Sequence, residues 1–296
     1  MYRETNLSRR ISIRTVSSAI LSTLLFFGVS SEPLGPTGAH AQGSGDLVVA
    51  PTRVVLEGRT RSEQLALVNK GAESATYRIT LINMRMGVDG SMTEISEPAE
   101  GEAFANRLVR YSPRQVTLAP GASQAVRLIA RKPKDLKPGE YRSHMMFRSV
   151  PKVQSQSVEN AANEGSSATL IPVFGIAIPV IVRHGELDYA VELTNGSLIP
   201  AVKEGELPRL KFDINRSGNR SAFGDLSASV TSGGDEVILG QIRRLAVYTP
   251  NQSRTVEMIL RVPEGTKLSG NNIKLTYKTI PDEGSRLLSE TTVAVP

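Results

Sequence analysis

Apolar and polar residues alternate along most of the chain after residue 46. Between residues 75 and 86, for example, Tyr77, Ile79 and Leu81 alternate with Thr76, Arg78 and Thr80. A period of two is typical of a strand with one buried face, and hardly any stretch shows a helical period. Runs of this kind lie at 47–58, 62–71, 75–86, 108–121, 123–131 and 139–150, and again at 187–194, 208–219, 224–237, 242–263, 272–280 and 289–296. The pattern predicts an all-β chain.

Turn residues and one polar segment divide these runs into two groups. Residues 151–168 have no apolar periodicity, and we expect them to form a long mobile loop before the last strand of the first group. The pattern restarts after Gly185, and Asn195-Gly196 is typical of a hairpin turn in the second group. We therefore predict two tandem β-sandwich domains, at 42–184 and 185–296.

The segment 170–183, LIPVFGIAIPVIVR, is the most apolar part of the chain after its N-terminus. It is rich in Ile and Val, as a strand should be, but it contains Pro172 and Pro179. Proline has no N–H for a ladder, so such a strand is expected at a sheet edge or with a bulge. An apolar edge favours aggregation unless something covers it.

The N-terminal residues are typical of a secretory signal peptide. Four arginines precede the apolar segment 19–29, which is too short to cross a bilayer as a helix, and Ala39-His40-Ala41 matches a cleavage site. We expect residues 1–41 to be removed and Gln42 to begin the mature chain. The alternative is an N-terminal membrane anchor.

Composition excludes several classes of protein. The expected mature chain keeps 35 − 4 = 31 basic and 29 − 2 = 27 acidic residues, an excess of four charges with no basic stripe, which gives nucleic-acid binding no support. Cysteine is absent, so cores and not disulfides stabilise the fold. His144 and His184 show no catalytic or metal-binding spacing, and we predict no enzyme activity, no cofactor and no metal.

Four segments resemble the PapD-like family of periplasmic pilus-assembly chaperones. They are VAPTRVVLEG at 49–58, SPRQVTLAPGASQAVRLIAR at 112–131, LKPGEYRSHMMFRSVP at 136–151 and IAIPVIVR at 176–183. Most of the resemblance lies in the first domain, while the second matches only as a generic sandwich. The resemblance implies two immunoglobulin-like domains and a periplasmic location. It also implies that the seventh strand completes the core of a client that lacks a strand.

The resemblance places client-binding side chains on the strand that follows the loop. Leu170, Pro172, Phe174, Ile176 and Ile178 would form the face donated to the client. The opposite face, with smaller side chains such as Gly175 and Ala177, would then pack in the chaperone's own core. An ordinary edge strand that binds no client is the alternative.

The resemblance also implies an anchor for the client's C-terminal carboxylate. Arg53 aligns with the family's arginine on the first strand, and a guanidinium suits a carboxylate. Arg53 could instead face solvent or pair with an internal acid. Pro179 occupies the family's lysine position and cannot bind an anion, and Arg183 matches an arginine that the family also has. The second charge could come from Arg142, Arg148, Arg131 or Lys132.

These features predict a non-enzymatic periplasmic chaperone. Its partners would be secreted pilin-like subunits and an outer-membrane usher, with no nucleic acid and no insertion of the mature chain into a membrane. The alternative is a two-domain immunoglobulin-like surface or adhesin-type structural module without a client.

Overall fold

The computed structural model describes residues 46–151 and 173–295, and the chain from Gly43 onward forms one compact unit. The predicted signal peptide, the cleavage before Gln42, the predicted loop beyond Pro151, and Leu170 and Pro172 lie outside the described residues. No helix within the described ranges is long and apolar enough to cross a membrane.

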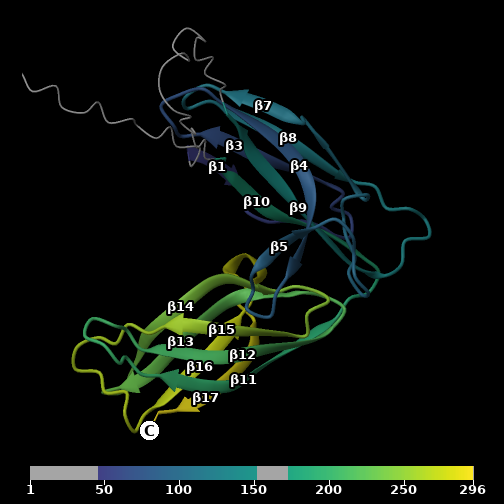
Figure 1. Ribbon diagram of the computed structural model, residues 1–296. Coiled ribbons are helices and arrows are strands. Elements are labelled where there is room, and N and C mark those ends of the chain that lie inside the picture. Colours follow the sequence, from purple (N-terminus) through teal and green to yellow (C-terminus); the bar gives the residue numbers. More distant parts are fainter. Residues whose placement is uncertain (1–45, 152–172, 296) are drawn as a thin grey trace, which may run out of the picture. The chain divides into compact units, whose positions relative to one another are not determined.

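The first sandwich contains two sheets, which can be followed in Figure 1. One sheet has the order β1-β3-β8-β6, with β1 at Leu47–Ala50, β3 at Ser62–Asn69, β8 at Ser123–Ala130 and β6 at Val109–Ser112. The other has the order β2-β10-β9-β4-β5, and β7 also pairs with β4. Its strands are β2 (Val54–Leu56), β10 (Gly175–His184), β9 (Gly139–Val150), β4 (Ala75–Met86), β5 (Met92–Ile95) and β7 (Gln115–Leu118).

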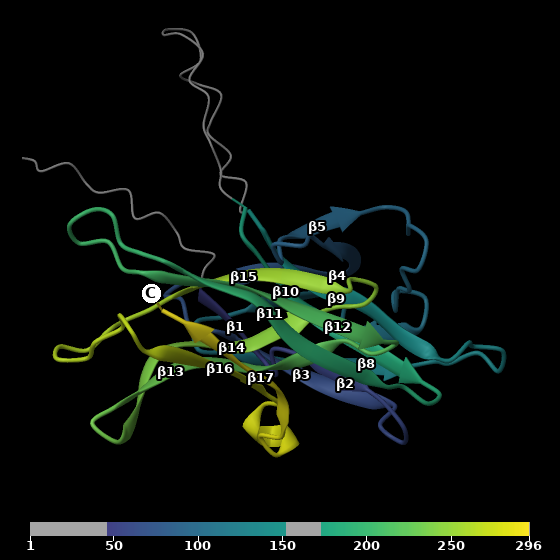
Figure 2. The same ribbon diagram turned by 90° about the horizontal axis from the view of Figure 1, so that it is seen from below.

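The second sandwich also contains two sheets, seen from below in Figure 2. The order β11-β12-β15 is formed by Tyr189–Ile199, Arg209–Gly218 and Ser253–Ile259. The order β14-β13-β16-β17 is formed by Asp235–Val247, Ala222–Ser232, Asn272–Lys278 and Leu287–Ala294, with the short 3-10 helix η3 (Pro281–Glu283) between the last two strands. The predicted all-β fold with two tandem sandwiches is confirmed.

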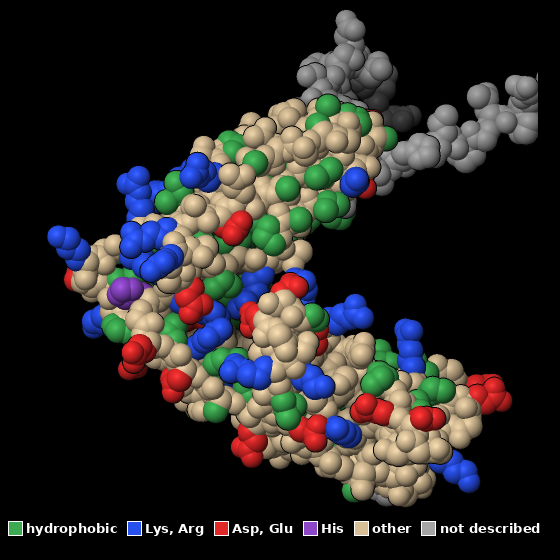
Figure 3. Space-filling view, turned by 180° about the vertical axis from the view of Figure 1, so that it is seen from behind, with side chains coloured by type: hydrophobic (Ala, Val, Ile, Leu, Met, Phe, Trp, Pro, Cys, Tyr) green, Lys and Arg blue, Asp and Glu red, His purple; other side chains and the backbone are tan. Residues whose placement is uncertain are grey.

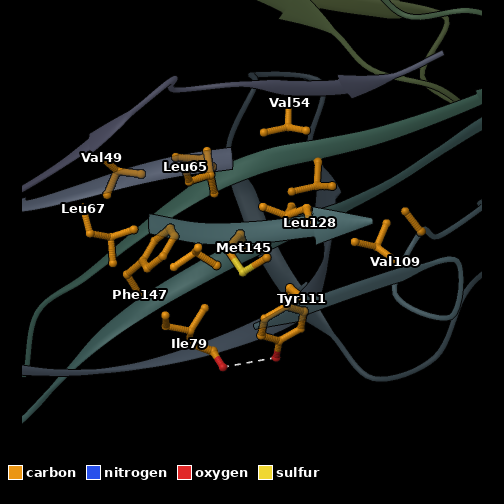
Figure 4. Close-up of a cluster of buried hydrophobic side chains, with 14 of the residues drawn as sticks. Val49, Val54, Leu65, Leu67, Ile79, Val109, Tyr111, Leu128, Met145 and Phe147 are labelled. Atoms are coloured by element: carbon orange, nitrogen blue, oxygen red, sulfur yellow. Dashed lines mark hydrogen bonds between the residues drawn. The ribbon is translucent and has the colours of Figure 1, made fainter. Parts of the chain in front are cut away.

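Alternating side chains from both sheets fill the core of the first sandwich (Figure 4). Leu65, Leu67 and Leu128 come from one sheet and Ile79 and Phe147 from the other, and all five are almost completely buried. The hydroxyl group of Tyr111 donates a hydrogen bond to the carbonyl oxygen of Ile79 at 3.1 Å, which joins the two sheets beside this core. Period-two alternation therefore sets which residues stabilise the domain.

Some element boundaries differ from the prediction. The run 47–58 divides into β1 and β2, which belong to different sheets, because the chain crosses between the sheets at residues 51–53. The predicted hairpin turn at Asn195-Gly196 is wrong, since β11 continues through it with a change of register between Thr194 and Ser197. Asn195 takes a positive φ of 54° there, so the Asn-Gly pair forms a bulge instead of a turn.

The faces of β10 are reversed from the prediction. Ile178 is 3% exposed in the core of the first sandwich, and Ile176 packs against the same core, so both lie on the core-facing side of β10. The residues on the opposite face have small side chains because Met146 lies over that face. A Cβ atom at Gly175 would lie 2.9 Å from the Met146 sulfur. The larger aliphatic side chains fill the core, where they bury more apolar surface.

Candidate functional site

The first half of β10 has an open edge. Strand β2 pairs in parallel with only Val180, Ile181 and Val182, since the chain before Val54 belongs to β1 in the other sheet. In the described part of the chain, residues 175–179 therefore have a neighbouring strand, β9, on one side only. We call this interval the β10 gap.

The hydrogen-bonding groups that face the β10 gap follow from the ladder with β9. The Ser149 N–H donates to the Phe174 carbonyl at 3.0 Å, and the register continues without a shift from Gly175 to His184. Since hydrogen-bonded and non-hydrogen-bonded pairs alternate in an antiparallel ladder, odd-numbered residues direct their backbone groups away from β9. Gly175 and Ala177 thus offer N–H and C=O groups to the gap.

Pro179 fits the same alternation. It lies opposite His144 in a non-hydrogen-bonded pair, so its missing N–H belongs to the gap side and the ladder with β9 remains complete. The predicted conflict between proline and a strand is resolved in this way. The gap therefore offers its last backbone donor at Ala177.

Arg53 lies at the end of the β10 gap, one residue before β2, where the parallel register brings it beside Pro179. Its side chain is only 9% exposed, and its guanidinium carbon lies 4.0 Å from the centre of the Phe223 ring. Nη1 is 3.8 Å from a Glu283 carboxylate oxygen, whereas Nε and Nη2 are buried without a hydrogen-bond partner among the described residues. Arg53 does not face solvent, and its internal ion pair satisfies only part of the group.

Burial is the main influence on the charge of Arg53. It lowers the pKa of the guanidinium, the nearby Arg183 lowers it further, and Tyr248, Glu140 and Glu283 act in the opposite direction. A buried cation with unused N–H groups is expensive unless an anion completes its contacts. Arg53 is therefore suited to an anionic ligand, and a carboxylate matches the planar fork of its donors.

Of the four proposed sources of a second charge, Arg142 resembles Arg53 most. It lies opposite Ile181, on the same face of the sheet as Arg53, and is 4% exposed. Its guanidinium carbon lies 4.3 Å from the centre of the Tyr248 ring, and Nε and Nη1 have no hydrogen-bond partner in the part of the chain that is described. Burial lowers the pKa of Arg142.

The other three cations are placed differently. Arg148 is exposed and lies 4.0 Å from Glu94, and Arg131 is also exposed. The Lys132 ammonium group donates to the Arg183 carbonyl at 2.5 Å, so it caps the end of β10. Among these four cations, then, Arg142 is the one with unused, buried N–H groups on the face of Arg53.

Arg183 is fully occupied by internal partners. Its Nε lies 2.9 Å from the buried carboxylate of Glu140, and its Nη1 lies 3.0 Å from Glu57. Although burial alone would lower it, these two carboxylates raise the pKa of Arg183. The other oxygen of Glu140 accepts a short hydrogen bond from the Ser221 hydroxyl, which joins β9 to the second sandwich. These two ion pairs give Arg183 a structural role.

Beside Pro179, His144 is 5% exposed and is held as the neutral imidazole. Burial, together with the charge of Arg142, lowers the His144 pKa to about 3. Its ring meets Tyr248 edge-on, with the ring centres 6.3 Å apart. Tyr248 and Phe223 come from strands of the second sandwich or their ends, and no spacing in the sequence indicated that they would cover residues of the first.

The structure brings only some of the predicted residues together. Phe174 adjoins the start of β10 and is 48% exposed, because it lies beyond the end of the core.

The described residues contain no group of three or more His, Cys, Asp and Glu side chains that could hold a metal ion. Acidic and basic side chains are interspersed on the face shown in Figure 3.

Comparison with known proteins gave matches of fold only. No family model matches the chain, and no curated protein matches its sequence. It is similar to the YadV chaperone, with 13% identity over 84% of this chain and 98% of that one and a TM-score of 0.44. It is also similar to the Pseudomonas aeruginosa CupB2 chaperone, with 13% identity, 84% and 100% coverage and a TM-score of 0.41. A third match is the CsuC–CsuE chaperone–tip adhesion subunit complex of Acinetobacter baumannii, with 12% identity, 83% and 96% coverage and a TM-score of 0.41.

Proposed function

We propose that this protein is a periplasmic chaperone of the PapD-like type, which binds secreted subunits that lack a strand. The client strand would occupy the β10 gap, pair with the backbone of Gly175 and Ala177, and cover the exposed Phe174. An outer-membrane usher would then receive the subunit. We place the boundary between the two domains in the connection between β10 and β11, after His184.

The observation that carries this proposal is an open strand edge that ends at a buried, incompletely paired cation. A client strand in line with β2 would run either parallel or antiparallel to β10. In the parallel orientation its C-terminal carboxylate reaches Arg53, whereas the antiparallel orientation would bring an N-terminal ammonium group there. Since like charges repel and a carboxylate completes the guanidinium, we propose the parallel orientation, with Arg53 binding the terminal carboxylate.

Arg142 is the proposed second source of positive charge. Both guanidinium groups lower the pKa of Tyr248, so both act on the same buried region. Arg142 would contribute a favourable potential there, on the face of the sheet that carries Arg53.

Capture of a co-expressed secreted subunit tests the proposal through Arg53. Arg53→Ala should reduce recovery of the complex strongly, because it removes a contact whose loss typically costs about 2–5 kcal/mol when the partner charge stays buried. Arg53→Lys should retain part of the binding, since it keeps the charge but not the planar fork. Arg110→Ala, at an exposed arginine of β6, is the matched control and should behave like the parent protein.

Phe174→Asp tests the strand itself, because it would place a charge in the apolar surface of the client. Capture should be lost while the melting temperature stays close to that of the parent, since Phe174 is half exposed. Capture that neither Arg53→Ala nor Phe174→Asp weakens would show that the client does not bind in the β10 gap, whereas a structural module would capture no subunit at all.

A further inference from the structure

Three methionines and one histidine line a cavity of about 360 Å³ beside Pro179. They are Met84 and Met86 of β4, Met92 of β5 and His144 of β9. The proposed chaperone activity makes no use of the thioether groups. His144 is almost completely buried, yet its Nδ1 atom has no hydrogen-bond partner among the described residues.

The strand registers place these four residues on one face of three neighbouring strands. Met86 lies directly opposite Met92, and such pairs have Cβ atoms about 4.5–5.5 Å apart. Met84 is two residues from Met86, so it shares the same face. His144 lies opposite Ile82 and is therefore diagonal to Met84, a relation in which residues lie about 7–8 Å apart. Long, flexible methionine side chains can converge across these distances.

The chemistry of this group favours a soft, monovalent metal ion. Thioether sulfur prefers soft ions such as Cu(I), and imidazole is also a copper ligand. His144 is almost completely buried and its Nδ1 atom has no partner among the described residues, so this nitrogen is open to a ligand. All four ligands are neutral, and Arg244 and Arg254 also line the cavity, so a divalent ion would gain no charge compensation.

The two arginines have partners that hold them in place. The Arg254 Nη1 donates to the Ala246 carbonyl at 2.7 Å, and the Arg244 Nη1 donates to the Thr52 hydroxyl oxygen at 3.4 Å. Repulsion from these cations is weaker for an ion with one charge than for an ion with two. The positive charge of these two arginines therefore disfavours Zn²⁺ and Cu²⁺ relative to a monovalent ion.

From these residues we infer that Met84, Met86, Met92 and His144 form a binding site for a monovalent soft metal ion, Cu(I) or its analogue Ag(I). Strand β5 then has a role that the chaperone activity does not require, because it supplies Met92 from the edge of the sheet. This inference does not depend on client binding.

Titration of the folded, full mature chain with Ag(I) tests the site, because Ag(I) has the same charge and softness as Cu(I) but does not need a reductant. The S-methyl groups of methionine, labelled with ¹³C, report each thioether separately by NMR. One equivalent of Ag(I) should shift the signals of Met84, Met86 and Met92. The signals of Met145 and Met258, which lie in the cores of the two sandwiches, should stay in place.

Substitutions then assign the ligands. Met92→Leu keeps the volume of the side chain and should weaken Ag(I) binding at least tenfold, and His144→Gln should do the same. Met258→Leu is the matched control and should bind like the parent. Thermal melts without metal identify a variant that has not folded, and in that case the Met92 variant and the NMR shifts decide. Absence of one-to-one binding, equal shifts at all methionines, or unchanged affinity in Met92→Leu would overturn the inference.

Discussion

Arg53, Arg142 and His144 are buried on one face of the same sheet, and each keeps at least one nitrogen without a partner in the described structure. Aromatic rings from the second sandwich contact all three residues, which limits their access to water. A site of this kind lowers the stability of the free protein, because desolvated cations are compensated only in part. An anionic ligand would recover that free energy on binding, and this links the electrostatics of the residues to the proposed capture of a carboxylate.

His144 provides a prediction about pH. Its pKa is about 3 in the folded chain, against 6.5 for an unperturbed histidine, so the unfolded chain takes up a proton at a pH where the folded chain does not. The free energy of unfolding should therefore fall as the pH drops from about 6.5 towards 3, by about 2–3 kcal/mol at pH 4.5 from this residue alone.

Urea unfolding at pH 7 and pH 4.5 measures this contribution when the parent is compared with His144→Gln. The variant should lose less stability between the two pH values than the parent. Carboxylates such as Glu102, whose pKa is lowered first by its hydrogen bond with Arg85, contribute equally to both proteins and cancel in the comparison. Parallel pH profiles would show that His144 is protonated in the folded state as easily as in the unfolded state.

The candidate residues differed in how far sequence could identify them. Arg53 stands out because a guanidinium on an apolar strand needs a partner, and a family resemblance placed it at an anchor. Arg142 was one of four possible cations, and only its burial on the face of Arg53 distinguishes it. Tyr248 and Phe223 gave no signal, because contacts between residues far apart in the chain leave no periodicity in either segment.

At the scale of the strand, the alternation of hydrogen-bonding direction along β10 explains how this apolar segment tolerates proline. Odd-numbered residues face the gap and even-numbered residues face β9, so Pro179 costs no bond within the protein. The effect of a further proline should depend on its parity. This gives a pair of substitutions that differ by one position in the chain.

Ala177→Pro should leave the stability nearly unchanged but weaken client capture, because it removes a donor that faces the gap. Ile176→Pro should instead lower the free energy of unfolding by about 3 kcal/mol or more, since it removes a bond to β9 as well as a side chain that packs against the core. Chemical denaturation and pull-down of the co-expressed subunit measure the two effects. If Ala177→Pro is the more destabilising substitution, the assigned hydrogen-bonding direction is wrong.

Sequence periodicity predicted the strands of this fold well where one face is buried along the whole strand. The runs 75–86 and 139–150 correspond to β4 and β9 without a difference of a single residue. Sequence periodicity failed where a boundary depends on which strands pair with each other. The division of 47–58 between two sheets and the bulge at Asn195 depend on partners elsewhere in the chain. The predicted facing of β10 is wrong because Met146 leaves room only for small side chains on the face of Gly175, while Ile176 and Ile178 pack in the core.

For the molecule as a whole, the hydrogen-bonded ion pair between Glu140 and Arg183 connects the two sandwiches through Ser221. Both charged side chains are nearly inaccessible, and loss of Glu140 would leave the buried Arg183 with only the half-exposed carboxylate of Glu57 as an anionic partner. Apolar contacts reinforce this link, since Ile181 and Met86 of the first sandwich pack with Phe223, Ala246 and Tyr248 of the second.

Glu140→Gln should therefore lower the free energy of unfolding by about 3–5 kcal/mol, the range for breaking one partner of a buried pair. Glu257→Gln is the matched control, because its ion pair with Arg209 is exposed on both sides and should contribute less than about 1 kcal/mol. Denaturant unfolding of both variants gives the comparison. Equal, small effects would mean that Arg183 is satisfied by Glu57 and solvent without Glu140.

The central claim is that a client strand pairs with the β10 gap, and amide hydrogen exchange tests it at the atoms concerned. In the free protein the N–H groups of Gly175 and Ala177 face the gap and should exchange rapidly, whereas those of Ile176 and Ile178 are bonded to β9 and should exchange slowly. In the complex with a co-expressed subunit, exchange at Gly175 and Ala177 should slow by more than about tenfold, equivalent to about 1.4 kcal/mol, while Ile176 and Ile178 change little. A stable complex in which Gly175 and Ala177 exchange as rapidly as in the free protein would contradict strand addition at this edge.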